Sequence, residues 1–261
     1  MTAKKRAAAS ITEVDAAIAW LEKHGKRSVR DGMGRYGIVA PRAFGVSMKD
    51  VQALGKRIGR NHALADGLWK SGWYEARTLV AFVAEPERLS VAEMNRWCKD
   101  FDNWAICDSL CFHLFDRSKH ALGRIDAWAG RREEFVRRAS FALLASVALH
   151  RHADDGELRA RLPLAVSAAD DDRNFVKKAV NWALRGIGER SLTLNAEAVA
   201  IAKRLAASDN ATERWVGKDA LRQLATPAVA KRLASRARAA AARAAKSKRA
   251  AKPKLAASRV G

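Results

Sequence analysis

Apolar residues recur every three or four positions along most of the chain, which is the spacing of one face of an α-helix. Valine and isoleucine do not cluster in the alternating runs that are typical of strands, and proline is scarce. The periodicity predicts helices over residues 12–24, 47–58, 62–71, 74–84, 90–100, 102–115, 120–128, 131–150, 154–168, 171–188, 194–206 and 210–225.

Three helices are expected to start at serine, because Ser10, Ser47 and Ser90 are each followed by an acidic residue three positions on. In this arrangement the serine and the acid each satisfy a backbone N–H group at the start of the helix. The helical segments come in pairs that repeat at roughly 35–45 residues, as in HEAT-like stacking. We therefore expect an all-α superhelical solenoid over residues 11–226, in which each helix pair buries its apolar face against the next.

The two ends of the chain depart from this pattern. Residues 1–10 and 227–261 hold almost no large apolar side chain, so we expect both to be disordered. The C-terminal tail alternates alanine with lysine and arginine, and its Ala-rich first half is a candidate for helix formation on DNA. From Lys231 to Gly261 there are eleven Lys or Arg and no Asp or Glu, so this tail carries a charge of +11.

The whole chain has a formal net charge of +21, which leaves +10 (21 minus 11) on the 230 residues before Lys231. A polyanion is the expected partner, because each Lys or Arg placed on a phosphate releases condensed counterions. An anionic membrane is the main rival, but no segment resembles an amphipathic anchor or approaches the length of a membrane span. Three cysteines and the lack of a signal-peptide pattern favour a protein of the reducing cytoplasm.

The segment 171–188 combines an apolar stripe with a separate basic one. On a helical wheel the core-facing stripe consists of Phe175, Val176, Ala179, Val180, Ala183 and Ile187. Trp182 falls on another face with Lys178 and Arg185. A tryptophan between two cations suits contact with a sugar or base while the cations hold phosphates. A tryptophan packed on a neighbouring helix beneath lysine and arginine stems fits the same spacing.

A second segment places a carboxylate on an aromatic face, because Trp104, Asp108, Cys111 and Phe115 share one stripe at i, i+4, i+7 and i+11. A charge there is costly unless it is paired, so Asp108 is either part of an ion pair or held for function. Arg138 points off the core face of residues 134–141. It can pair with Asp108, reach a phosphate, or do both, and a purely structural ion pair is the alternative.

Six stretches of the sequence together closely resemble the AlkD-like DNA alkylation repair family of HEAT-like repeat DNA glycosylases. They are RDGMGRYGI (30–38), FGVSM (44–48), LWKSG (68–72), EARTL (75–79), WCKDFDNW (97–104) and RNFVKKAVNWALR (173–185). The resemblance covers residues 12–225. It implies a HEAT-like superhelix with a basic concave groove for duplex DNA, and excision of N3- and N7-alkylated purines that carry a positive charge.

The resemblance also implies roles for particular residues. The active-site tryptophans correspond to Trp104 and Trp182, the catalytic aspartate to Asp108, and the active-site arginine to Arg138, with the adjacent Arg137 as the alternative. No metal or cofactor is expected. The residues that we expect to bind DNA are Lys178, Arg185, Arg30 and Arg35.

These residues suggest a mechanism. A purine that is already cationic leaves without protonation, so a single carboxylate can replace the usual glycosidase pair. Asp108 would stabilise the oxocarbenium-like sugar and position the attacking water. The sequence therefore favours a monofunctional DNA-alkylpurine glycosylase, a hydrolase that acts as a monomer on damaged double-stranded DNA in the nucleoid. The alternatives are a non-catalytic HEAT-repeat protein that recognises damaged or branched DNA and, less favoured, a HEAT-type protein adaptor.

Several other signals are interpreted as structural. GMGRYG at 32–37 matches a dinucleotide-binding motif in letters only, because no strand precedes it. Cys107 and Cys111 lie near His113 but have no second ligand pair, so we interpret them as core thiols. The acids at 170–172 complement the start of a helix. His150 and His152 lie beyond a helix end and are interpreted as solvated residues.

Overall fold

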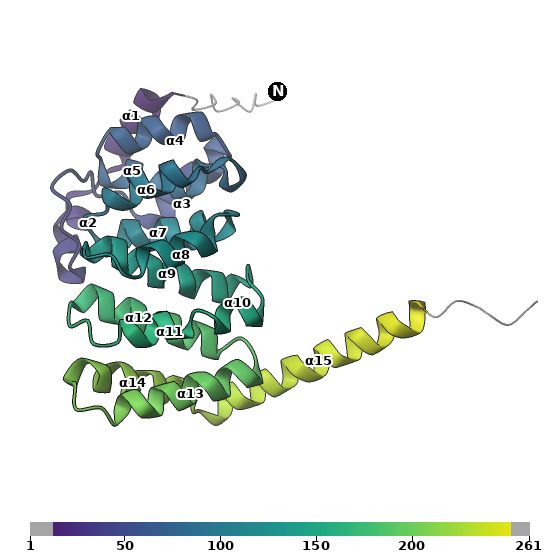
Figure 1. Cartoon of the computed structure of the whole chain (residues 1–261). Coiled ribbons are helices and arrows are strands. Elements are labelled where there is room, and N and C mark those ends of the chain that lie inside the picture. Colours follow the sequence, from purple (N-terminus) through teal and green to yellow (C-terminus); the bar gives the residue numbers. More distant parts are fainter. Residues whose placement is uncertain (1–12, 252–261) are drawn as a thin grey trace, which may run out of the picture.

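The computed structural model describes residues 13–251, and every regular element in that range is helical (Figure 1). The elements are α1 Val14–His24, α2 Arg27–Gly32, η1 Met33–Tyr36, α3 Met48–Ile58, α4 His62–Lys70, α5 Tyr74–Val83, η2 Pro86–Arg88, α6 Val91–Lys99, α7 Trp104–His113, η3 Phe115–Arg117, α8 Ala121–Trp128, α9 Glu134–His150, α10 Asp155–Arg159, α11 Leu162–Ser167, α12 Asn174–Gly188, α13 Leu192–Ala206, α14 Ala211–Leu224 and α15 Pro227–Ala251.

The helices stack as a two-layered solenoid that runs from α1 at one end to α14 at the other (Figure 1). Helices α5, α7, α9, α12 and α14 contact one another in succession and form the first layer. Helices α4, α8, α11 and α13 form the second layer, and each packs on the first-layer helix that follows it in the chain. The all-α, HEAT-like solenoid expected from the pairing of helical segments is confirmed.

The length of the repeat can be measured from side-chain hydrogen bonds that join corresponding positions of neighbouring repeats. The indole of Trp69 donates to Asp100, 31 residues on, and the guanidinium of Arg161 donates to Asp126, 35 residues back. Near the C-terminal end of the stack, residues joined in this way are 38 apart. These spacings of 31 to 38 residues overlap the short end of the range of 35–45 that the sequence pattern indicates.

The serine caps form where the sequence predicts them. Ser47 accepts a hydrogen bond from the backbone N–H of Asp50, and Ser90 forms a full capping box with Glu93. The third predicted cap, Ser10, lies outside the described residues.

The predicted helices differ from the observed ones at two places. The segment 154–168 forms two helices, α10 and α11, because Pro163 lies in the first turn of α11, where a proline begins a helix but cannot continue one. Helix α2 was not predicted, because it buries none of its residues and so has no apolar periodicity.

The C-terminal segment also differs from expectation. Residues 227–251 form the helix α15 instead of a disordered tail, and most of it projects away from the stack (Figure 1). Alanine, arginine and lysine are strong helix formers, and Val229 and Leu233 anchor the first turns by being buried. Arg232 forms an ion pair with Glu189 that adds to this anchor. The disorder expected at residues 1–10 and 252–261 lies outside the described residues.

Helices of the described segment include none that is both long and apolar enough to cross a bilayer. The three cysteines are all free and buried, and two of them donate to backbone carbonyl groups of α9. This agrees with their interpretation as core thiols.

Candidate active site

Helix α7 presents a row of three half-buried side chains, Trp104, Asp108 and Phe112, at i, i+4 and i+8. The expected stripe is correct as far as Asp108 and wrong beyond it. Cys111 and Phe115 are fully buried, and Phe115 belongs to η3 because α7 ends at His113. Phe112 therefore continues the row.

Asp108 is held by Arg138 of α9 in a bidentate ion pair. Nε of Arg138 donates to Oδ1 of Asp108 at 2.9 Å and Nη2 donates to Oδ2 at 2.6 Å, while Nη1 donates to the carbonyl of Phe175 at 2.6 Å. The adjacent Arg137 is bonded instead to Asp171 at 2.9 Å. Of the two arginines considered from the sequence, Arg138 is thus the one at Asp108, although its side chain is buried rather than turned to solvent.

The pair lies in an environment of low polarity. Burial raises the pKa of Asp108, and the charge and hydrogen bonds of Arg138 act against that rise. Burial also disfavours the charge on Arg138, but Asp108 outweighs this effect, so the pKa of Arg138 is raised. Both carboxylate oxygens accept from guanidinium N–H groups, which is the geometry of an ionised carboxylate. The Asp108 side chain keeps 20% of its surface exposed.

Two cavities meet at Trp104 and Asp108. One, of about 520 Å³, lies between η1, α7, α9 and α12, and its walls include Arg138, Phe175 and Lys178. The other, of about 600 Å³, extends toward the N-terminal repeats and is lined mainly by apolar residues, among them Val29, Met33, Val46, Val51 and Tyr74. Arg35 and Tyr36 line both cavities. Asp108 therefore borders both cavities.

The segment around η1 forms one wall of the site. The indole N–H of Trp104 donates to the carbonyl of Tyr36 at 2.9 Å. Gly37 follows with φ of +66°, in the left-handed region that favours glycine, and it faces the ring of Phe175. The connection after η1 is fixed by the buried carboxylate of Glu75, which accepts hydrogen bonds from the backbone N–H groups of residues 44, 45 and 46 at 3.0, 2.7 and 3.1 Å.

The second expected tryptophan is not in the Asp108 cavity. Trp182 is half-buried and stacks on Phe112, with ring centroids 6.3 Å apart, at the far end of the α7 row. The aromatic side chain opposite Trp104 is Phe175, which the sequence analysis assigned to the core stripe of its helix; that assignment is wrong. Phe175 and Trp182 are seven residues apart and so share a helix face, which is a signal in the sequence that points to Phe175.

Two of the four expected DNA-binding cations lie at the site. Arg35 and Lys178 are exposed and line the cavity beside Asp108. Arg30 is exposed but lines neither cavity, and its Nε lies 3.7 Å from the carboxylate of its neighbour Asp31. Arg185 donates to the amide oxygen of Gln223 at 2.5 Å and belongs to a separate depression at α14.

Fold and site together define a HEAT-like repeat protein with an ionised Asp–Arg pair at the wall of an aromatic, basic cavity. The family model described as DNA alkylation repair enzyme matches residues 17–224. The chain belongs to this family.

Two solved structures are similar to this chain, and the first of them supports the fold. One, described as "A new family of proteins related to the HEAT-like repeat DNA glycosylases with affinity for branched DNA structures", superposes with a TM-score of 0.68 at 20% identity and covers 80% of this chain and 94% of its own. A designed armadillo repeat protein, YIII(Dq)4CqI, superposes with a TM-score of 0.36 at 12% identity and covers 81% of this chain and 92% of its own. No curated protein sequence matches the chain.

Proposed function

We propose that this protein is a DNA glycosylase that excises positively charged N3- and N7-alkylated purines from duplex DNA by hydrolysing the N-glycosidic bond. The observation that carries the proposal is the Asp108 carboxylate, which is held by Arg138 at the wall of a cavity that also contains Trp104 and the cations Arg35 and Lys178. Membership of the DNA alkylation repair enzyme family supports the same assignment.

The chemistry needs one anion at the sugar. A cationic purine is a good leaving group, so no general acid has to protonate it, and the deoxyribose becomes oxocarbenium-like as the bond breaks. A fixed carboxylate stabilises that charge and orients water toward the anomeric carbon. Asp108 supplies the anion, because each of its oxygens keeps a lone pair after accepting from Arg138 and a fifth of its side chain is exposed.

The neighbouring residues have supporting roles in this proposal. Trp104 packs against the sugar, where the electron-rich face of the indole favours the developing cation. Arg138 is a positioning residue that fixes both oxygens of Asp108. Arg35 and Lys178 neutralise backbone phosphates beside the lesion, and Trp182 contacts the DNA further along the α7 row. We also propose that the protein acts as a monomer and that it works at the nucleoid in the cytoplasm, where its DNA substrate lies.

The test is substitution of the carboxylate by its neutral isostere. In Asp108→Asn, release of 7-methylguanine from alkylated duplex DNA should fall by about a hundredfold or more under single-turnover conditions, because the transition-state charge loses its anion. Duplex affinity should stay close to that of the wild type, since the cations are unchanged.

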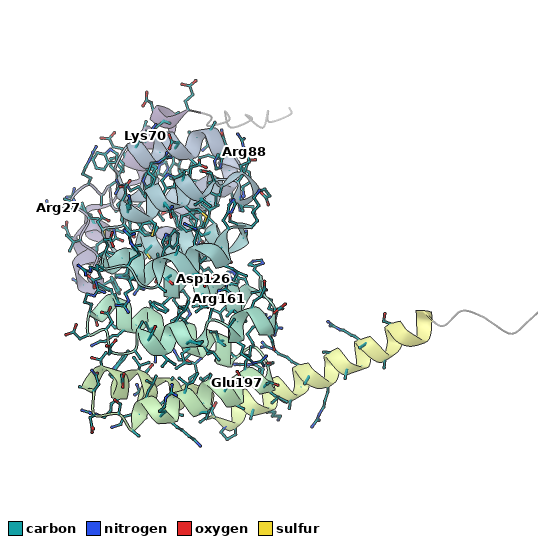
Figure 2. All side chains as sticks on the ribbon, in the orientation of Figure 1. Arg27, Lys70, Arg88, Asp126, Arg161 and Glu197 are labelled. Atoms are coloured by element: carbon teal, nitrogen blue, oxygen red, sulfur yellow. The ribbon has the colours of Figure 1, made fainter. Side chains whose placement is uncertain are left out.

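The matched control is Asp126→Asn, which breaks another Arg–Asp pair between repeats, with Arg161 at 2.7 Å (Figure 2). Neither residue lines the two cavities at Asp108. This variant should excise at the wild-type rate. Equal losses in both variants would mean that the effect is structural, and wild-type excision by Asp108→Asn would remove Asp108 from the catalytic role.

A second candidate is a DNA-binding protein without excision activity. Two observations favour it: both oxygens of Asp108 are already engaged by Arg138, and the solved relative with the same fold is described as having affinity for branched DNA. It predicts tight binding to branched or alkylated DNA but no base release by the wild-type protein in the same assay. Base release without added metal or cofactor would exclude it.

A further inference from the structure

A second cluster of titratable side chains lies at the C-terminal end of α9. It consists of Asp116 from η3, His150 at the last position of α9, and His152 just beyond it. His150 Nδ1 lies 2.5 Å and His152 Nε2 lies 3.5 Å from Oδ2 of Asp116. The interpretation as solvated residues beyond a helix end is wrong for His150, which is half-buried and is the last residue of α9. His152 is exposed and lies beyond the helix, as expected, but it also contacts the carboxylate of Asp116.

The backbone between the two histidines is turned to make this possible. Arg151 has φ of +63°, and it is the one non-glycine residue of the described chain with a positive φ. That conformation is unfavourable for a residue with a side chain. It ends α9, with the N–H of Arg151 donating to the carbonyl of Val147, and lets His150 and His152 approach Asp116 together.

Asp116 is incompletely satisfied by these contacts. Its side chain is fully buried, and among the described residues its Oδ1 has no hydrogen-bond partner. A buried carboxylate oxygen without a partner is costly, so such an atom calls for a ligand that the contacts within the chain do not supply. A cation that the carboxylate chelates through both oxygens, and that the two imidazoles beside Oδ2 also bind, is such a ligand.

We propose that Asp116, His150 and His152 bind a divalent transition metal ion, with Zn²⁺ as the preferred ion. Two imidazole nitrogens and one carboxylate form a donor set that such ions favour, and a ligand atom from each of the three residues lies within 4.8 Å of the other two. Ligand atoms on a tetrahedral zinc ion are about 3.3 Å apart, so the 3.5 Å separation at His152 already fits. His150 has to withdraw by about 1 Å, and the fourth position is open to water.

The metal ion would link two segments of the first layer. It joins η3, which follows α7, to the end of α9, and the ring of His150 packs edge-on against Phe112 with centroids 4.2 Å apart. Phe112 in turn stacks on Trp182. Through these contacts the ion would order the side chains of Phe112 and Trp182. It would have no part in bond cleavage at Asp108. The proposal is independent of the glycosylase assignment.

The experiment titrates metal-free, untagged full-length protein with Co²⁺ and follows the visible ligand-field absorption, with Zn²⁺ as competitor. We expect one Co²⁺ per chain, displaced by Zn²⁺, and a Zn²⁺-dependent rise in Tm. His152→Ala and His150→Ala should each weaken binding by about tenfold or more, and His152 is exposed enough for its variant to fold.

The matched control is His62→Gln, because His62 pairs with one carboxylate, Glu93 at 3.0 Å, and belongs to no group of three candidate ligands within residues 13–251. It should bind Co²⁺ like the wild type. No absorption band with the wild type, or a band of wild-type strength in both His150→Ala and His152→Ala, overturns the proposal and leaves the cluster as a contact between Asp116 and the two histidines without a metal.

Discussion

Two buried acids, Glu75 and Asp171, and the half-buried Asp108 illustrate how single residues determine this fold and its site. The carboxylate of Glu75 accepts hydrogen bonds from three backbone N–H groups and so fixes the connection after η1. Asp171 forms ion pairs with two arginines, Arg137 and Arg173, and so joins α9 to the start of α12. Asp108 is also held by an arginine, but it alone of the three borders the two cavities at Trp104. Position relative to the cavities, not residue type, distinguishes the candidate catalytic acid.

Asp171 gives a prediction on pH. Burial alone would raise the pKa of Asp171, but the hydrogen bonds and charge of Arg173, with the charge of Arg137, hold it below its ordinary value. An acid whose pKa is lower in the folded state stabilises the fold above its unfolded pKa of about 3.9, and this stabilisation disappears as pH falls through the folded pKa.

We therefore expect Asp171→Asn to lower the free energy of unfolding by about 2 kcal/mol at pH 7, with the difference from wild type shrinking toward acid pH. Urea unfolding from pH 7 to pH 3 measures this. The half-exposed pair at Asp126 provides the control, since Asp126→Asn should cost less than about 1 kcal/mol. A difference at Asp171 that does not change with pH would contradict the electrostatic explanation.

At the scale of elements, the repeats depend on close helix crossings. Helices α13 and α14 pack so tightly that a Cβ atom on Gly217 would collide with backbone atoms of Ala202 and Ala206. A Cβ atom on Gly55 of α3 would similarly collide with the Cβ atom of Phe82 in α5. Small residues at these positions set the distance between helices, and hence the place of each first-layer helix at the site.

Gly217→Ala should therefore destabilise the protein by about 1–3 kcal/mol, because the backbones of α13 and α14 have to separate. Gly123 of α8 is the matched control, since a Cβ there meets no atom within 4 Å. Gly123→Ala should stabilise by about 0.5–1 kcal/mol through helix propensity alone. Thermal unfolding compares the two, and equal effects at both glycines would contradict the crossing argument.

At the scale of the whole molecule, the most prominent feature is α15, a basic helix that extends from the solenoid (Figure 1). The helix is anchored to the last repeat by Val229 and Leu233, and its remainder extends away from the stack without an acidic residue (Figure 1). Such an arm suits non-specific contact with the phosphates of a long duplex, in addition to the cations at the cavity.

Two truncations separate the anchor from the arm. Removal of residues 237–261 takes away eight Lys or Arg, so it should weaken duplex binding and flatten its salt dependence while Tm stays unchanged. Removal of residues 227–261 should also lower Tm, because it uncovers the surface of α13 that α15 packs on. Binding isotherms at several salt concentrations and melting curves check both, and a full-strength salt dependence in the shorter deletion would exclude the arm as a DNA contact.

The sequence by itself determined the helices, most of their boundaries, the serine caps and the stacking in pairs, because these follow from apolar spacing and local hydrogen bonds. It also placed Trp104 and Asp108 together, since residues four apart on a helix are neighbours whatever surrounds them. The basic character that indicates a polyanionic partner is likewise a property of composition.

Only the tertiary structure decided which side chains from different repeats meet. It selected Arg138 over Arg137 for Asp108, brought Phe175 to the cavity in place of Trp182, and gathered Asp116 with His150 and His152. These contacts join residues about thirty or more positions apart, so they depend on how each helix is rotated and how closely it packs on the next. Apolar periodicity identifies the buried face of a helix but leaves that rotation and packing undetermined.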